Sequence, residues 1–82
     1  MKLRVLYFAA VRELVAMDEE SVDAGDDVRT VRDFARWIGT RHPALAPRMT
    51  HVRIARNEAF AGDDDPLADG DVLALIPPVA GG

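Results

Sequence analysis

The glycine pair Gly81–Gly82 gives this sequence its most reactive candidate group, a carboxylate on a bare backbone. Glycine lacks a Cβ, so two in succession make the thinnest end a polypeptide can have, one able to enter a narrow active site. A frayed terminus is usually polar, whereas this end follows an apolar strand. Pro77 and Pro78 prevent that strand from continuing, because each fixes φ and removes a backbone donor. The residues expected to thread a partner's active site are Pro77, Pro78, Val79, Ala80 and Gly81.

The side chains elsewhere in the sequence do not combine into an active site of their own. The absence of cysteine removes disulfides, thiolate metal sites and a cysteine nucleophile. His42 and His51 lack the spacing of a helical metal site, and Ser21 has no histidine near it in the sequence. The glycines match neither a P-loop nor a dinucleotide fingerprint. We therefore expect no metal site and no bound cofactor, and the catalytic group would be the carboxylate of Gly82.

A carboxylate becomes a useful electrophile only after activation. Adenylation by ATP converts it into an acyl adenylate, which sulfide or persulfide can attack to give a thiocarboxylate. Attack by a thiol or an amine gives a protein conjugate instead. Glycine suits both routes because no side chain hinders the carbonyl. The ATP site and the catalytic side chains would then belong to partner proteins.

Composition limits the partners that such a chain can have. Eighty-two residues that are 49% hydrophobic suffice for one small domain with one core. The net charge of −4 argues against nucleic acid, which requires a basic face. With no signal sequence and no apolar run of membrane-spanning length, we expect a cytoplasmic protein without a membrane partner. The acidic clusters expected to be solvated turns are Asp18–Glu20, Asp26–Asp27 and Asp63–Asp65.

Hydrophobic periodicity predicts several short strands and one main helix. Thr30 and Asp33 form a capping box at the start of this helix, and Pro43 ends it after Arg41. Its buried stripe is expected to comprise Val31, Phe34, Ala35 and Ile38. The expected strands are Leu3–Phe8, Glu20–Ala24, His51–Arg56, Glu58–Ala61 and Asp71–Ile76, with a short helical segment at Ala9–Val15 and a loop at Pro43–Pro47.

This order of elements predicts an α+β fold in which one main helix packs on one face of a mixed sheet. If two hairpin-like halves flank the helix, the first and last strands become parallel neighbours at the centre, which is the β-grasp arrangement. The domain would span residues 1–76, followed by a flexible tail at 77–82. Alternation places Leu6, Phe8 and Ile76 on the face without a helix, where they would form an apolar docking surface beside the tail.

Five segments along the whole chain carry a family resemblance. They are Tyr7–Val15, Thr30–Phe34, Ala55–Glu58, Leu67–Val72 and Leu75–Gly82. In order and content they resemble the MoaD-type small subunit of molybdopterin synthase, a ubiquitin-like sulfur carrier of β-grasp fold. The ending Pro-Pro-Val-x-Gly-Gly after an apolar strand is the most specific of them. Arg56 departs from the pattern, since relatives more often carry an apolar residue before Asn57.

The resemblance implies that an E1-like adenylating enzyme (MoeB type) activates Gly82 with ATP and that a sulfurtransferase supplies the sulfur. The tail would then enter the large subunit (MoaE type) within a heterotetramer. There it would donate sulfur to cyclic pyranopterin monophosphate, building the dithiolene of molybdopterin for molybdenum cofactor biosynthesis. The chain would act in the enzyme as sulfur donor, with catalytic groups on the large subunit. By position, the family's partner contacts fall on Phe8, Phe60 and Ile76, and Arg12 would have a structural or interface role.

Three other functions fit the same tail. A ThiS-type carrier for thiamine thiazole synthesis shares the fold and the thiocarboxylate, but such chains usually lack the helical insert expected at residues 9–15. A ubiquitin-like protein modifier would form an isopeptide bond through Gly82. Lys2 is the only lysine of this chain, so polymers built on the protein itself are not expected. A β-grasp interaction module with an incidental glycine end is the third.

Overall fold

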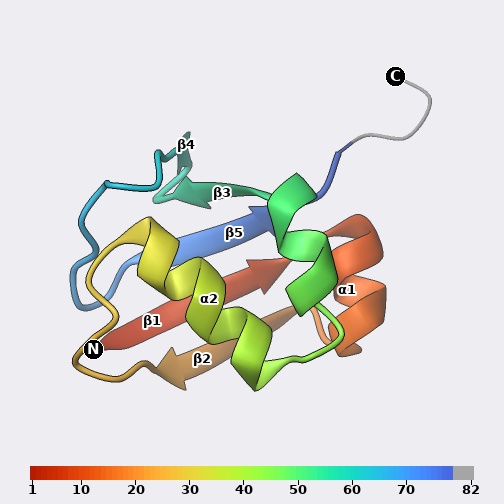
Figure 1. The fold of residues 1–82 in the computed structure, drawn as a ribbon, viewed down its shortest axis with the longest axis horizontal. Helices are drawn as coiled ribbons and strands as arrows, with labels where there is room; N and C mark the ends of the chain where they lie inside the picture. The colour runs from red at the N-terminus through yellow and green to blue at the C-terminus, as the bar shows by residue number, and fades with distance from the viewer. Residues whose placement is uncertain (79–82) are drawn as a thin grey trace.

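The computed structural model describes residues 1–78, in which five strands form one mixed sheet (Figure 1). The strands are β1 (Lys2–Tyr7), β2 (Glu19–Asp23), β3 (Arg53–Arg56), β4 (Ala59–Phe60) and β5 (Val72–Ile76). The helices are α1 (Ala9–Val15), α2 (Val31–Arg41) and the 3₁₀ helix η1 (Ala46–His51). The predicted tail runs on to Gly82, and its residues Val79, Ala80, Gly81 and Gly82 lie outside the described part of the chain.

The sheet has the strand order β2-β1-β5-β3-β4. Its two central strands, β1 and β5, run parallel, with Val5 opposite Leu73. β2 is antiparallel to β1, and β3 is antiparallel to β5. The predicted β-grasp arrangement is therefore confirmed: the first and last strands are parallel neighbours, and α2 lies across one face of the sheet (Figure 1).

The core lies between α2 and the sheet face that it covers. The odd-numbered side chains of β1 (Leu3, Val5 and Tyr7) are buried, as expected from the alternation that places Leu6 and Phe8 on the opposite face. From the helix, Phe34 and Ile38 are both 0% exposed. Burial of such side chains contributes about 1.5–3 kcal/mol each, a large part of the stability of a domain of this size.

The start of α2 has the predicted capping box. The Asp33 N–H donates to the Thr30 hydroxyl oxygen at 3.2 Å, and Asp33 Oδ2 accepts from the Thr30 N–H at 3.1 Å. The Arg29 N–H donates to the same carboxylate at 3.0 Å. These bonds from Arg29 and Thr30 lower the pKa of Asp33, because they stabilise its charged form. The helix ends at Arg41, as Pro43 requires.

Three local predictions were wrong. The loop expected at Pro43–Pro47 gives way at Ala46 to η1, whose first turn tolerates Pro47 because N–H groups there have no helical partner. His51 belongs to η1, so β3 begins only at Arg53. Of the acidic clusters, Asp18–Glu20 is not a turn, since its last two residues form the start of β2.

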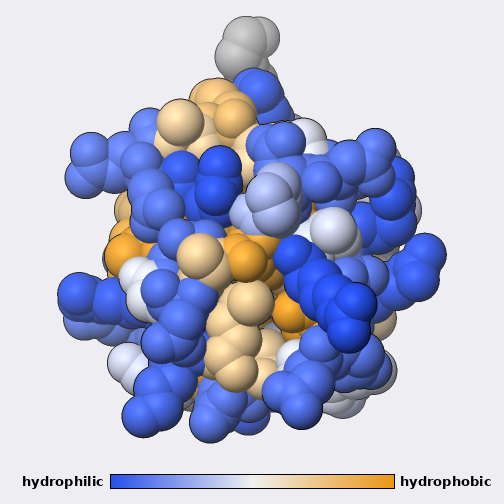
Figure 2. Space-filling view, turned by 90° about the vertical axis from the view of Figure 1, so that its left-hand side faces the viewer, coloured by the Kyte–Doolittle hydropathy of each residue, from blue (hydrophilic) through white to orange (hydrophobic). Residues whose placement is uncertain are grey.

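Hydrophilic side chains cover most of the end of the molecule shown in Figure 2, around a narrow band of apolar surface. Asp26, Asp27, Asp63 and Asp64 are exposed as expected, and the last two pair with Arg32. Among the helices of residues 1–78, none combines the length and the apolar character that crossing a bilayer requires.

Candidate functional site

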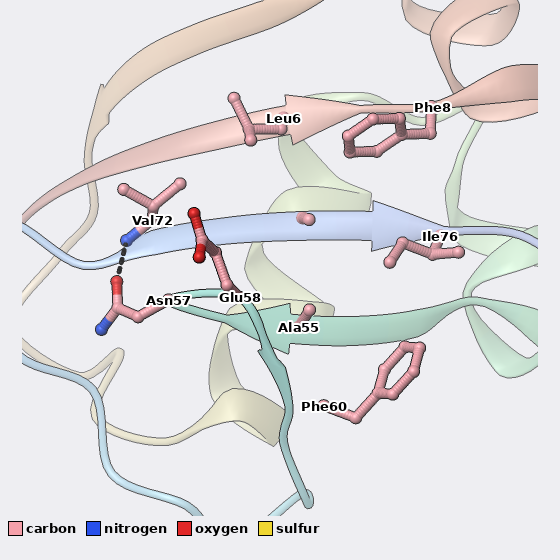
Figure 3. Close-up of a pocket in the computed structure, with 9 residues that line it drawn as sticks. Leu6, Phe8, Ala55, Asn57, Glu58, Phe60, Val72 and Ile76 are labelled. Carbon is pink, nitrogen blue, oxygen red and sulfur yellow. Dashed lines mark hydrogen bonds between the residues drawn. The ribbon is translucent and has the colours of Figure 1, made fainter.

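The sheet face opposite α2 contains a shallow pocket of about 580 Å³ (Figure 3). Strands β1, β3, β4 and β5, together with the turn between β3 and β4, provide its wall. The lining residues are Leu6, Phe8, Ala55, Asn57, Glu58, Phe60, Val72, Ala74 and Ile76. The pocket is apolar at one end and polar at the other, and different segments of the chain form the two ends.

The apolar end lies where β1 and β5 finish. Phe8 is 46% exposed and Phe60 is 56% exposed, which is unusual for phenylalanine in a small domain. Figure 3 shows the two rings on either side of Ile76. The structure thus brings together the side chains that alternation placed on this face and the positions named from the family resemblance. Exposed apolar groups gathered in this way are typical of a surface for another protein.

The ring of Phe60 is in contact with a cation. Arg53 Cζ lies 3.6 Å from the centre of the Phe60 ring, close enough for a cation–π contact. Both residues belong to the β3–β4 hairpin at the edge of the sheet. Such a contact at an exposed site contributes about 0.5–1 kcal/mol and limits the positions that the ring can take.

The polar end is made by a two-residue turn. Asn57 and Glu58 connect the paired residues Arg56 and Ala59, and both have positive φ (51° and 73°), as a type I′ hairpin turn requires. The Asn57 N–H donates to the Val72 carbonyl oxygen at 2.8 Å, and the Val72 N–H donates to Asn57 Oδ1 at 2.9 Å. These two bonds attach the turn to the start of β5.

The side chain of Asp71 also holds this turn in place through hydrogen bonds. This carboxylate residue is only 7% exposed. Asn57 Nδ2 donates to Asp71 Oδ1 at 2.9 Å, and the Ala68 N–H donates to Asp71 Oδ2 at 2.8 Å. Arg56 Nη1 lies 4.0 Å from Asp71 Oδ2 and donates to the Pro66 carbonyl oxygen at 3.1 Å. The side chain of Arg56, the position that departs from the family pattern, therefore braces the loop before β5 rather than lining the pocket.

The first tail residues leave the sheet beside the apolar end. Pro77 and Pro78 line a second, smaller pocket of about 160 Å³. Its other lining residues come from α1 and from the region of η1: Ala10, Val11, Leu14, Arg48, His51 and Val52. Ile76 belongs to the first pocket and Pro77 to the second. The chain that leads to Gly82 thus starts directly next to the apolar face.

Arg12 is the one predicted partner-binding residue that the structure does not bring to the pocket. It lies on α1, is exposed, and its Nη1 is 3.6 Å from Asp18 Oδ1. An exposed ion pair of this kind contributes about 0–1 kcal/mol. An interface role for Arg12 stays a prediction.

A partly buried charge cluster on the covered side of the sheet was not foreseen. Glu20 Oε2 accepts from the Tyr7 hydroxyl at 2.7 Å and lies 2.9 Å from His42 Nε2. Glu20 Oε1 accepts from Arg41 at 2.9 and 2.6 Å. Burial alone would raise the pKa of Glu20, but the bonds from Arg41, His42 and Tyr7 outweigh it and hold that pKa at about 2. Burial, followed by the bond to Glu20, raises the pKa of Tyr7.

Within residues 1–78 there is no group of three histidine, aspartate or glutamate side chains placed to hold a metal ion. The pocket wall supplies apolar surface, a fixed amide and one carboxylate. Such a surface can bind another protein, and it adjoins the root of the tail.

Comparison with known proteins extends over the full chain. The ThiS family model matches residues 5–82. A molybdopterin synthase sulfur carrier subunit from Chlamydomonas reinhardtii is 38% identical, with 100% of both chains covered. The crystal structure of SAMP1 from Haloferax volcanii matches with a TM-score of 0.86 at 32% identity, again over 100% of both chains. A chain in the complex of subunits 1 and 2 of the molybdopterin-converting factor from Helicobacter pylori matches with a TM-score of 0.70 at 26% identity, with 100% of both chains covered.

Proposed function

This chain belongs to the ThiS family, and we propose that it is the sulfur-carrier small subunit of a molybdopterin synthase. The observation that carries the proposal is the apolar pocket on the helix-free face, with Phe8, Phe60 and Ile76 at the end from which the tail departs. The curated relative named as a molybdopterin synthase sulfur carrier favours the molybdopterin pathway over thiamine synthesis. The complex of subunits 1 and 2 supports a large subunit as the partner.

The proposed chemistry takes place at the carboxylate of Gly82. On an adenylating enzyme this carboxylate attacks the α-phosphate of ATP, and pyrophosphate leaves. A hydrosulfide ion, which a thiol reductant releases from the persulfide of a sulfurtransferase, then attacks the carbonyl carbon, and AMP leaves as the thiocarboxylate forms. On the large subunit the thiocarboxylate sulfur attacks a carbon of the pterin precursor and displaces an oxygen leaving group, which joins Gly82 to the pterin through sulfur. Water then attacks the Gly82 carbonyl carbon and breaks its bond to sulfur, so the sulfur stays on the pterin and the carboxylate is restored. Because a dithiolene contains two sulfur atoms, two carriers are consumed for each pterin.

In this series of reactions, residues 1–78 contribute the docking surface rather than groups that react. The apolar face binds each partner, and the position of Pro77 next to that face directs the tail into the partner's active site. Catalytic side chains are supplied by the large subunit. The chain is thus part of the enzyme as its sulfur donor.

The proposal is tested by incubating the protein with its cognate adenylating enzyme, ATP and a sulfur source. The intact mass is expected to rise by the exchange of one oxygen for one sulfur, located at Gly82 by fragmentation. The thiocarboxylate form, mixed with the large subunit and the pterin precursor, is expected to yield a dithiolene. An unchanged mass would overturn the carrier role, and a thiocarboxylate that yields no dithiolene would point to the thiamine pathway.

A second candidate, protein modification, is favoured by the likeness to SAMP1 of Haloferax volcanii, which is small archaeal modifier protein 1. Conjugation would use the same acyl adenylate but a lysine amine as the nucleophile. Glycine–glycine remnants on lysines of other proteins after proteolysis would support it. If cells that make the thiocarboxylate contain no such remnants, protein modification is wrong and the carrier role is the function that stands.

Phe8→Ala is expected to weaken binding to the large subunit about 10- to 100-fold, as loss of an aromatic anchor does. The free energy of unfolding should change by less than about 1 kcal/mol, because the ring is half exposed. Phe34→Ala is the matched control, since the same substitution at a fully buried ring should cost about 3–5 kcal/mol. Titration calorimetry and thermal melts measure the two effects. A stability loss at Phe8 as large as that at Phe34 would show that Phe8 belongs to the core.

A further inference from the structure

Glu58 is the only ionisable residue among those that line the apolar pocket. Its side chain is exposed, and with the other residues of the range 1–78 it forms no hydrogen bond or ion pair. Figure 3 shows its carboxylate over β5, close to Val72, rather than turned away from the sheet.

The backbone holds Glu58 in this place. Its φ of 73° lies in the left-handed region, which costs a residue with a Cβ about 1–2 kcal/mol. The neighbouring Asn57 is bound to both backbone groups of Val72 and to buried Asp71. The turn therefore cannot swing away from β5 without breaking these three bonds. Glu58 is presented to the pocket by a fixed part of the fold.

A partner that covers the pocket must compensate the negative charge of Glu58. Docking of apolar side chains between Phe8 and Phe60 removes water from the whole groove, including the end that holds Glu58. A carboxylate that loses water without a cation or a donor is costly. Asn57 makes no bond to Glu58: its Nδ2 donates to Asp71 Oδ1, and its Oδ1 accepts from the Val72 N–H. The missing group must come from the partner.

We propose that the large-subunit segment that occupies this pocket carries a basic side chain, arginine or lysine, that pairs with Glu58. An apolar residue of the same segment fills the end between Phe8, Phe60 and Ile76. The inference rests on the proposed function, because it concerns the partner in sulfur transfer. Glu58 selects for a basic group at one end of the groove while the tail departs at the other, so it also sets the orientation of docking.

The test compares Glu58→Gln and Glu58→Lys with the wild-type protein in binding to the cognate large subunit, over a range of salt concentrations. Glu58→Gln is expected to raise the Kd about tenfold and to reduce its dependence on salt. Glu58→Lys is expected to raise the Kd about 100-fold, because two cations then face each other. Glu13→Gln, the same change at an exposed glutamate of α1, should alter the Kd by less than about twofold.

The outcomes separate this inference from the proposed function. If Glu58→Gln behaves like Glu13→Gln while Phe8→Ala still weakens binding, the charge pairing is wrong and the docking face stands. If the wild-type protein does not bind the large subunit, both are wrong. Thermal melts of all variants verify the fold. The Gln and Lys variants keep a long side chain at a position with positive φ, so they should melt close to the wild-type protein.

Discussion

Deletion of Gly81 and Gly82 is expected to reduce dithiolene formation on the large subunit to background. Two extended residues span about 7 Å, so the shortened chain would place its carboxylate that far short of the reacting carbon. A displacement of only about 1 Å can lower a rate about 100-fold. The new end would also be Ala80, whose methyl group hinders attack at the carbonyl. A coupled assay with ATP, a sulfur source and the pterin precursor measures the loss.

The same deletion distinguishes the contribution of the tail to activity from the contribution of the folded domain to stability and binding. The melting temperature should not change, because all described strands and helices end at or before Ile76. The truncated protein should still bind the large subunit through its apolar face and therefore compete with the full chain. Ala80→Gly, which keeps the length, serves as the control and should retain activity. Turnover by the truncated protein within about tenfold of wild type would contradict the assignment of the reaction to Gly82.

The features that could be predicted from the sequence are those with a local pattern. Alternation in β1 placed Leu6 on the face without a helix, which leaves Leu3 and Val5 for the core, because strand side chains change face at every residue. The capping box of Thr30 and Asp33 located the start of α2. Both patterns arise within a few residues, so tertiary contacts had little opportunity to override them.

The turn at Asn57–Glu58 lacked such a pattern. Glutamate rarely adopts positive φ, and Glu58 stands at the second turn position, where glycine marks most turns of this type. The turn forms because Asn57 bonds to Val72 and Asp71, which are 14 or more residues away. The polar end of the pocket was missed for this reason. The apolar end was found because Phe8 and Ile76 finish strands whose alternation could be followed.

The cluster around Glu20 is formed by residues that lie even farther apart in the sequence. Tyr7, Glu20, Arg41 and His42 come from β1, β2 and the end of α2, and each is unremarkable alone. Glu20 has 13% of its side chain exposed, although it stands in a sequence cluster with the composition of a solvated turn. Only the folded sheet brings its carboxylate beneath the C-terminal end of the helix. Through these contacts the Glu20 carboxylate connects the end of α2 to strands β1 and β2.

Glu20→Gln is expected to lower the free energy of unfolding by about 3 kcal/mol at pH 7, with the difference from wild type vanishing as the pH falls to about 2. The pKa of Glu20 drops from an ordinary 4.5 to about 2 on folding, so its stabilisation is complete above pH 4.5 and is lost as the pH falls toward 2. Denaturant unfolding of both proteins at several pH values measures this difference. Glu19→Gln is the control, because Glu19 pairs with Arg4 at the exposed surface and should contribute less than about 1 kcal/mol. A difference between Glu20→Gln and wild type that stayed constant from pH 7 to pH 2 would mean that packing of this side chain, and not its charge, holds α2 to the strands.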